Sequence, residues 1–182
     1  MTTLFSRLLT RKGYGVQSPF AYHIVRHVIG EQLPYYAYAT LREAYGKHPD
    51  EPFLRLLLRL SNDLQPSSCR IDLRETADTR QREVFSQYIL AGCKRCQIEK
   101  LTQLIPNQHN IVVVDNTRSA FYELINVSIK PEGCLALKRS KDDKKLWQEM
   151  TNHPIATQVF DINNRYALIF WKRKMTHAVY HL

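Results

Sequence analysis

One short apolar run ends in an acid: Ile111-Val112-Val113-Val114-Asp115-Asn116. Four consecutive β-branched residues, with no polar residue between them, are typical of a strand that is buried on both faces of a parallel sheet. Similar runs occur before and after it, and helical runs separate several of them. The predicted strands are 69–73, 96–100, 110–115, 133–138, 157–162 and 167–172, and the predicted helices are 79–91, 119–129 and 142–151. We therefore expect an α/β fold with a mostly parallel sheet covered on both faces.

The last two predicted strands are joined by a short polar connection, Asn163-Asn164-Arg165. A crossover between parallel strands needs a dozen residues or more, whereas a short polar turn suits an antiparallel hairpin. The sheet is therefore expected to end in an antiparallel pair.

The first part of the chain has apolar residues at helical spacing. Ser18-Pro19 predicts the start of one helix, because serine caps helices and proline is tolerated in their first turn; Leu33-Pro34 predicts its end. A further helical run covers 53–64. We expect a helical N-terminal extension over 1–64 packed on an α/β domain over 65–182, within a single globular unit.

The composition limits the class of protein. No apolar run approaches the roughly 20 residues that span a bilayer, and the first residues lack a signal-peptide pattern, so we expect a cytoplasmic protein without membrane contact. The four cysteines are expected to be reduced thiols in a chain long enough to fold without disulfides. A net charge of +9 favours an anionic partner, such as nucleic acid, acidic lipid or an acidic protein, without choosing among them.

A parallel sheet closed by a C-terminal antiparallel hairpin is also the layout of class I S-adenosylmethionine-dependent methyltransferases. Residues 111–116 resemble the family's fourth strand, and Tyr122 falls in the helix that follows it. The stretch Lys130-Pro131-Glu132-Gly133-Cys134-Leu135-Ala136-Leu137 resembles the family's "lkPGG" turn and fifth strand, with one glycine fewer in the turn. Stretches 12–20, 33–38 and 147–170 resemble other parts of small bacterial O-methyltransferase-like members. The resemblance covers most of the chain and implies a Rossmann-like methyltransferase fold.

The family's glycine-rich cofactor motif is missing. No glycine lies between Gly46 and Gly92, and the turn after the first predicted strand reads Arg74-Glu75-Thr76-Ala77-Asp78. In one register, residues 69–73 are the family's first strand and its glycine loop is replaced by this charged turn. In the register that we prefer, because the position of Gly92 fits and the chain is short, residues 71–73 are the second strand and the fold is truncated at the first β/α unit, roughly 30 residues. Both registers remove the loop, so no cofactor is expected.

Two acids are candidate site residues through the resemblance. In the preferred register, Asp72 occupies the place where the family holds the cofactor's ribose hydroxyls; the alternative is a surface carboxylate that caps a helix or pairs with Arg70 or Arg74. Asp115 matches the first acid that holds a divalent ion in the metal-dependent O-methyltransferase branch, which makes it the candidate catalytic residue. Lys138-Arg139 replaces the second acidic pair and would repel a cation, so no metal site is expected.

Three other groups of residues carry less specific signals. Cys93-Lys94-Arg95-Cys96 has the spacing of redox or zinc pairs but lacks a second pair, and we interpret it as ordinary residues at a strand entrance. His23 and His27 share a helical face and are expected in a packing seam. The tyrosines crowd into the N-terminal part, where they form either a lid on the sheet or a stacking surface; they are Tyr14, Tyr22, Tyr35, Tyr36, Tyr38 and Tyr45.

Three functions remain open from the sequence. The leading hypothesis is a degenerate methyltransferase homologue without cofactor binding, which acts as an interaction or regulatory module through an unknown protein partner or through self-association. The first alternative is a divergent, active small-molecule O-methyltransferase that uses S-adenosylmethionine. The second is a basic, aromatic-rich RNA-binding protein, although no RNA-recognition motif accompanies the charge.

Overall fold

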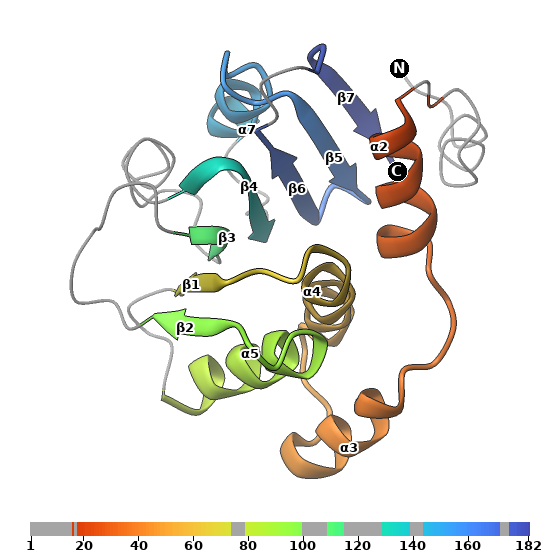
Figure 1. Ribbon diagram of the computed structural model, residues 1–182, viewed down its shortest axis with the longest axis vertical. Helices are drawn as coiled ribbons and strands as arrows, with labels where there is room; N and C mark the ends of the chain where they lie inside the picture. Colours follow the sequence, from red (N-terminus) through yellow and green to blue (C-terminus); the bar gives the residue numbers. More distant parts are fainter. Residues whose placement is uncertain are drawn as a thin grey trace. The chain divides into compact units, whose positions relative to one another are not determined.

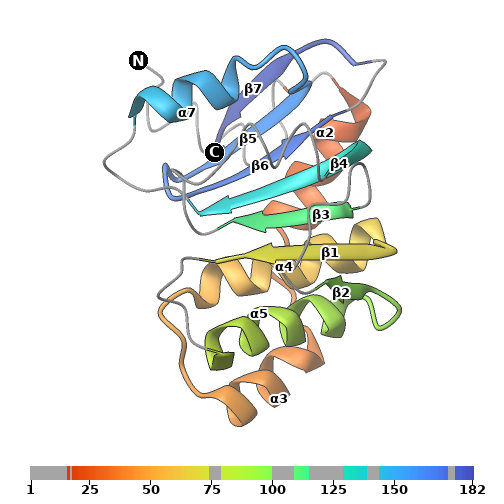
Figure 2. The same ribbon diagram turned by 90° about the vertical axis from the view of Figure 1, so that its left-hand side faces the viewer.

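The computed structural model of the protein (Figures 1 and 2) describes residues 16, 18–73, 79–99, 109–114, 129–138, 144–171 and 175–182. These residues belong to two units. The helical unit comprises the described residues of 1–65 and 78–96 together with Leu182, and the sheet unit comprises those of 66–77 and 97–181. No described helix is long and apolar enough to cross a membrane.

In the sheet unit, the described residues form a seven-stranded sheet in the order β2-β1-β3-β4-β6-β5-β7 (Figure 2). The strands are β1 (Ser68–Asp72), β2 (Gln97–Glu99), β3 (His109–Val114), β4 (Ile129–Lys138), β5 (Gln158–Ile162), β6 (Tyr166–Phe170) and β7 (Ala178–His181). β2, β1, β3 and β4 are parallel, and β6 is antiparallel to both β4 and β5. The predicted α/β fold, Rossmann-like with a mostly parallel sheet and a C-terminal antiparallel hairpin, is confirmed.

The central strands are buried on both faces. On β4, the consecutive residues Cys134, Leu135, Ala136 and Leu137 are each at most 1% exposed, although their side chains point alternately to opposite faces. One face is covered by α7 (Lys144–Thr151), whose Trp147 and Met150 join a core cluster with strand residues such as Leu135 and Ile169. Burial on both faces explains why the strands read as continuous apolar runs rather than as an alternating pattern.

The hairpin between β5 and β6 has the turn that its sequence predicts. Asn163 and Asn164 both have positive φ, 55° and 54°, and the Arg165 N–H donates to the Ile162 carbonyl at 3.0 Å. This is the primed type of turn, whose twist matches the flanking strands, and asparagine tolerates its left-handed backbone better than most residues. The Asp161 carboxylate also accepts from the Asn164 N–H at 3.2 Å and fixes the turn.

The C-terminal tail forms a strand, β7, at the edge of the sheet. It is parallel to β5 and is tied to it by side chains as well as by the backbone ladder. Gln158 donates to the Thr176 carbonyl at 2.8 Å, and the Phe160 and Tyr180 rings stack with centroids 5.1 Å apart. The sheet therefore contains β7 in addition to the six predicted strands.

The helical unit contains α2 (Pro19–His23), a π-helix η1 (Ile24–Ile29), α3 (Tyr36–Tyr45), α4 (Glu51–Leu64) and α5 (Thr79–Gly92). Ser18 caps α2 as predicted, because its hydroxyl accepts from the Ala21 N–H at 3.3 Å. α4 is buried on most sides and packs against α5 and η1. α3 was not expected, since Leu41 is its one buried residue and its apolar periodicity is therefore weak.

The start of β4 differs from the prediction by several residues. β4 begins at Ile129, inside the predicted helix 119–129, and it includes residues 130–133, which were interpreted as a turn. The reason is an irregular ladder: His109 pairs with Ile129 and Ile111 pairs with Cys134, so that four residues of β4 face Asn110 alone. The rest of that predicted helix lies outside the described residues, as does the helical pattern around residues 5–9.

Gly92 lets α5 approach α4 closely. A Cβ atom at this position would overlap the Leu58 carbonyl oxygen and would lie 2.9 Å from both the backbone nitrogen of Asn62 and the Cβ of Ser61. Gln65, in left-handed conformation at the end of α4, donates to the carbonyls of both Asn62 and Gly92, at 2.7 Å and 3.3 Å. The ends of the two helices are thereby joined.

Gly92→Ala tests this close approach. Helix propensity alone favours alanine by roughly 1 kcal/mol, whereas the overlap with backbone atoms of α4 is expected to destabilise the fold by about 1–3 kcal/mol. The melting temperature should fall by about 2–4 °C for each kcal/mol. The control is Gln87→Ala in the same helix, which should change stability by less than about 0.5 kcal/mol. An unchanged or raised melting temperature for Gly92→Ala contradicts the packing argument.

Candidate functional site

The strand order of the sheet reverses at β1. This strand is hydrogen-bonded on one side to β2, which follows it in the chain, and on the other side to β3. Figure 2 shows β1 between these two strands, with its arrowhead on the same side as that of β3. In open α/β sheets, ligands bind outside the carboxyl ends of the strands at such a switch point. The carboxyl ends of β1 and β3 are therefore the candidate ligand site of the sheet unit.

Asp72 lies at this switch point. It is the last residue of β1 and is in register with Val114, the last residue of β3. Its side chain is half-buried and interacts with other residues of the chain. An ionised carboxylate offers acceptor sites only, which suits it to hold hydroxyl groups of a ligand.

The other predicted site residue, Asp115, follows Val114 in the chain and lies outside the described residues. The turn at 74–78 and Arg139 lie outside them too. Lys138 is described: it ends β4 and is in register with Tyr166 of β6. Of the predicted acids, the structure therefore locates Asp72 alone.

The surroundings of Asp72 on β1 are charged. Asp72 shares a face of the strand with Arg70, because side chains two positions apart on a strand point to the same side. Arg70 is 7% exposed and lies in register with Glu99 of β2. Glu99, Arg70 and Asp72 thus form a band of alternating charge on β2 and β1, while the residues of β3 in register with Arg70 and Asp72 are valines.

The part of the chain that the structure describes contains no cluster of metal-ligating side chains. Within the described ranges, no group of three or more histidine, cysteine, aspartate or glutamate side chains is placed to hold an ion.

The cysteines are buried thiols. Cys69, Cys93, Cys96 and Cys134 are all buried, and none is joined to another in a disulfide, as expected from the sequence. Burial, with a smaller contribution from Cys93, raises the pKa of Cys96 to about 12. Burial likewise raises the pKa of the Cys134 thiol. Since the thiolate is the nucleophile and the metal ligand, these thiols are suited to packing rather than to redox chemistry.

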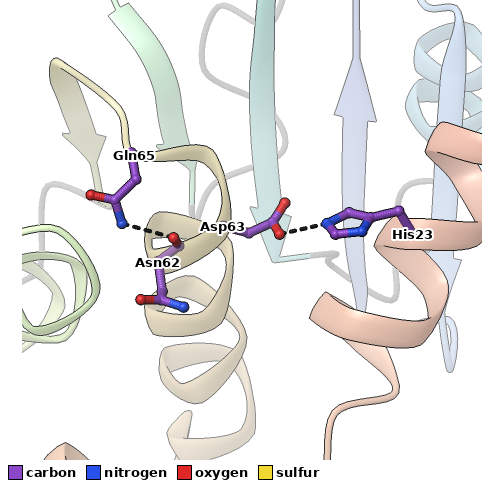
Figure 3. A network of polar contacts seen from close by, with 4 residues as sticks. All are labelled: His23, Asn62, Asp63 and Gln65. Atoms are coloured by element: carbon purple, nitrogen blue, oxygen red, sulfur yellow. Dashed lines mark hydrogen bonds and ion pairs between the residues drawn. The ribbon is translucent and has the colours of Figure 1, made fainter.

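His23 and His27 were expected in a packing seam, and this prediction is wrong. Both are exposed, with ring centroids 5.0 Å apart. His23 Nε2 lies 2.6 Å from the Asp63 carboxylate and links α2 to α4 (Figure 3). The physical reason is the apolar stripe of the helical segment: Ala21, Ile24, Val25 and Val28 follow the i, i+3, i+4, i+7 spacing and are buried, which leaves both histidines on the opposite, exposed face.

A hollow in the helical unit lies at residues that no sequence motif singled out. It is lined by Lys47, His48, Glu51, Arg55, Arg59 and two prolines. Tyr38, one of the crowded tyrosines, contacts both arginines: the Arg55 guanidinium lies 4.8 Å from the centre of its ring, and Arg59 donates to its hydroxyl at 3.4 Å. The available signal was the spacing of four between Glu51, Arg55 and Arg59, which places them on one helix face.

Alkylation of the native protein tests the buried thiols. With a pKa of about 12, only about one Cys96 in ten thousand is a thiolate at pH 8, so iodoacetamide should label it slowly, and faster as pH rises. All four cysteines should react in denaturant. The matched control is Lys94→Cys, an exposed thiol in the same turn, which should be labelled rapidly. Native Cys93 and Cys96 reacting as fast as this control would rule out the packing role.

Comparison with known proteins finds solved structures of similar fold, and two methyltransferases are among them. One is a methyltransferase from Geobacter sulfurreducens, 12% identical, with a TM-score of 0.47, covering 78% of this chain and 92% of that chain. The other is the SAH-bound methyltransferase PaMTH1 from Podospora anserina, 9% identical, with a TM-score of 0.49, covering 86% of this chain and 97% of that chain. No family model and no curated protein matches the chain. At these values the likeness concerns fold only, and the methyltransferase-like fold rests on this chain's own parallel strands, strand order and C-terminal hairpin.

Proposed function

We propose that the protein is a degenerate methyltransferase homologue that does not bind S-adenosylmethionine and acts as an interaction or regulatory module. One observation carries the proposal. β1 ends at Asp72 and α5 begins at Thr79, and the connection between them contains no glycine. In doubly wound folds the connection after the first strand carries glycines, because a ligand's phosphates or ribose must approach the backbone closely. The chain lacks this glycine loop whether β1 takes the place of the first strand or of the second.

The glycine that follows this connection serves another purpose. Gly92 lies at the far end of α5, where it permits contact with α4. The missing side chain of glycine thus serves helix packing in this part of the chain.

The partner in this proposal is another protein or a second copy of the chain. In the helical unit, the link from η1 to α3 and the first residue of α3 expose large side chains: Leu33 is 71% exposed and Tyr36 is 99% exposed. Aromatic residues are enriched where proteins bind one another. The proposal also places the protein in the cytoplasm, where buried thiols without disulfides are the rule.

The alternative is a divergent, active small-molecule O-methyltransferase. The observation that favours it is the position of Asp72, in register with the end of β3 at the switch point of the sheet. In that case Asp72 holds the ribose hydroxyls of S-adenosylmethionine, the cofactor supplies the methyl group, and Asp115 acts on the substrate hydroxyl.

Calorimetric titration with S-adenosylmethionine and S-adenosylhomocysteine distinguishes the proposed interaction module from the enzyme alternative. We expect no binding at millimolar ligand to protein that unfolds cooperatively, and no rise in melting temperature, because a ligand stabilises a fold only when it binds the native state. Binding with micromolar affinity would overturn the proposal. If it occurs, Asp72→Asn should weaken it about tenfold or more under the enzyme alternative, whereas Glu43→Gln, an exposed acid on α3, should leave it unchanged.

A further inference from the structure

The hollow in the helical unit has the size of a small-molecule site. Its volume is about 600 Å³, within the range typical of ligand pockets. It lies where the link from α3 to α4 meets the first turns of α4. Lys47 and His48 come from the link, and Glu51, Arg55 and Arg59 come from successive turns of the helix.

The lining of the hollow is cationic. Lys47, Arg55 and Arg59 carry three positive charges against the single carboxylate of Glu51, which leaves an excess of two. Glu51 is paired with Arg55. Lys47 has no hydrogen-bond or ion-pair partner among the described residues, and it is exposed. An anion in the hollow would therefore meet charges that the protein itself does not neutralise.

The two arginines are held in place before any ligand arrives. Arg59 Nε donates to the Val28 carbonyl at 2.6 Å, and its Nη1 donates to the Tyr38 hydroxyl at 3.4 Å. Arg55 is fixed by Glu51 at one side and by the Tyr38 ring at the other. Arg55 and Arg59 are one helical turn apart, which is about 6 Å along the axis of α4. Because little side-chain freedom is left to lose, donors fixed in this way bind with a smaller entropy cost.

His48 adds a neutral donor. The Asp50 N–H donates to His48 Nδ1 at 3.1 Å, so this nitrogen is the acceptor. In the neutral ring the proton is then on Nε2, which is a donor. The same link is stiffened by Pro49 and by a hydrogen bond from the Glu51 N–H to the His48 carbonyl at 3.1 Å.

We propose that this hollow binds a phosphoryl group of a small phosphorylated molecule. Each guanidinium group has five N–H donors, and those not bonded to Glu51, Val28 or Tyr38 are left for a ligand. With an ammonium and an imidazole N–H beside them, these donors suit a phosphoryl group, which has three terminal oxygens and carries up to two negative charges. The site also lies at the N-terminal end of α4, a 14-residue helix whose dipole favours an anion there. The hollow is larger than a phosphoryl group and accommodates the rest of the molecule.

Calorimetric titration of the full chain with pyrophosphate, at low salt, tests the proposal. We expect saturable binding of one pyrophosphate per chain. Arg55→Lys and Arg59→Lys keep the positive charge but replace the planar guanidinium group with an ammonium group, and each should weaken pyrophosphate binding about tenfold. Lys47→Gln should weaken it several-fold, and this variant removes no contact within the described residues. The control is Lys94→Gln, which makes the same charge change at an exposed position of the helical unit and should leave the affinity unchanged.

Several outcomes would overturn the proposal. They are the absence of saturable binding at millimolar pyrophosphate, an equal loss of affinity in Lys94→Gln, and binding of citrate as tight as that of pyrophosphate. A phosphoryl group can also belong to the backbone of a nucleic acid, so the same titration is made with a single-stranded RNA oligonucleotide. If it binds more tightly than pyrophosphate and the same three substitutions weaken it, the phosphoryl group belongs to a nucleic-acid backbone and the small-molecule assignment is wrong.

Discussion

The pairing of β1 with a parallel strand on each side is the constraint on which the sheet unit depends. Its register with β3 brings Asp72 beside Val114, and its register with β2 brings Arg70 beside Glu99. Because side chains alternate along a strand, a slip by one residue would turn Arg70 to the other face and would exchange it with the fully buried Cys69. The register therefore fixes both the switch point of the sheet and the charged band next to it.

The buried strands of this chain could be predicted from its sequence, because apolar runs and turn residues are local signals. The hairpin at Asn163-Asn164-Arg165 is the clearest case, since polar residues that tolerate positive φ specify the turn by themselves. β7 and α3 were harder to predict from the sequence. β7 is an edge strand whose residues are only half-buried, and it depends on contacts with β5. α3 buries Leu41 alone and so lacks a clear apolar stripe.

The site could be predicted only in part. The acid at the end of β1 could be proposed as a site residue through the family resemblance, which gives an acid a place at the end of this strand. The cationic hollow was not evident, since Lys47, Arg55 and Tyr38 come from separate elements that only the packed helical unit brings together. His23 was misjudged because its spacing from His27 was considered without the apolar stripe at residues 21, 24, 25 and 28, which places both histidines on the opposite face.

The absence of a glycine turn between β1 and α5 and the presence of the proposed anion site are physically compatible, because a glycine turn and this site rely on different groups. A Rossmann-type turn binds phosphate or ribose through backbone N–H groups, and for this it needs residues without side chains. The hollow at the start of α4 uses side chains instead, and their orientation is set by Tyr38, Glu51 and the Val28 carbonyl. Side-chain recognition places no demand on glycine. A charged connection between β1 and α5 is therefore compatible with a helical unit that holds a negative charge through its own side chains.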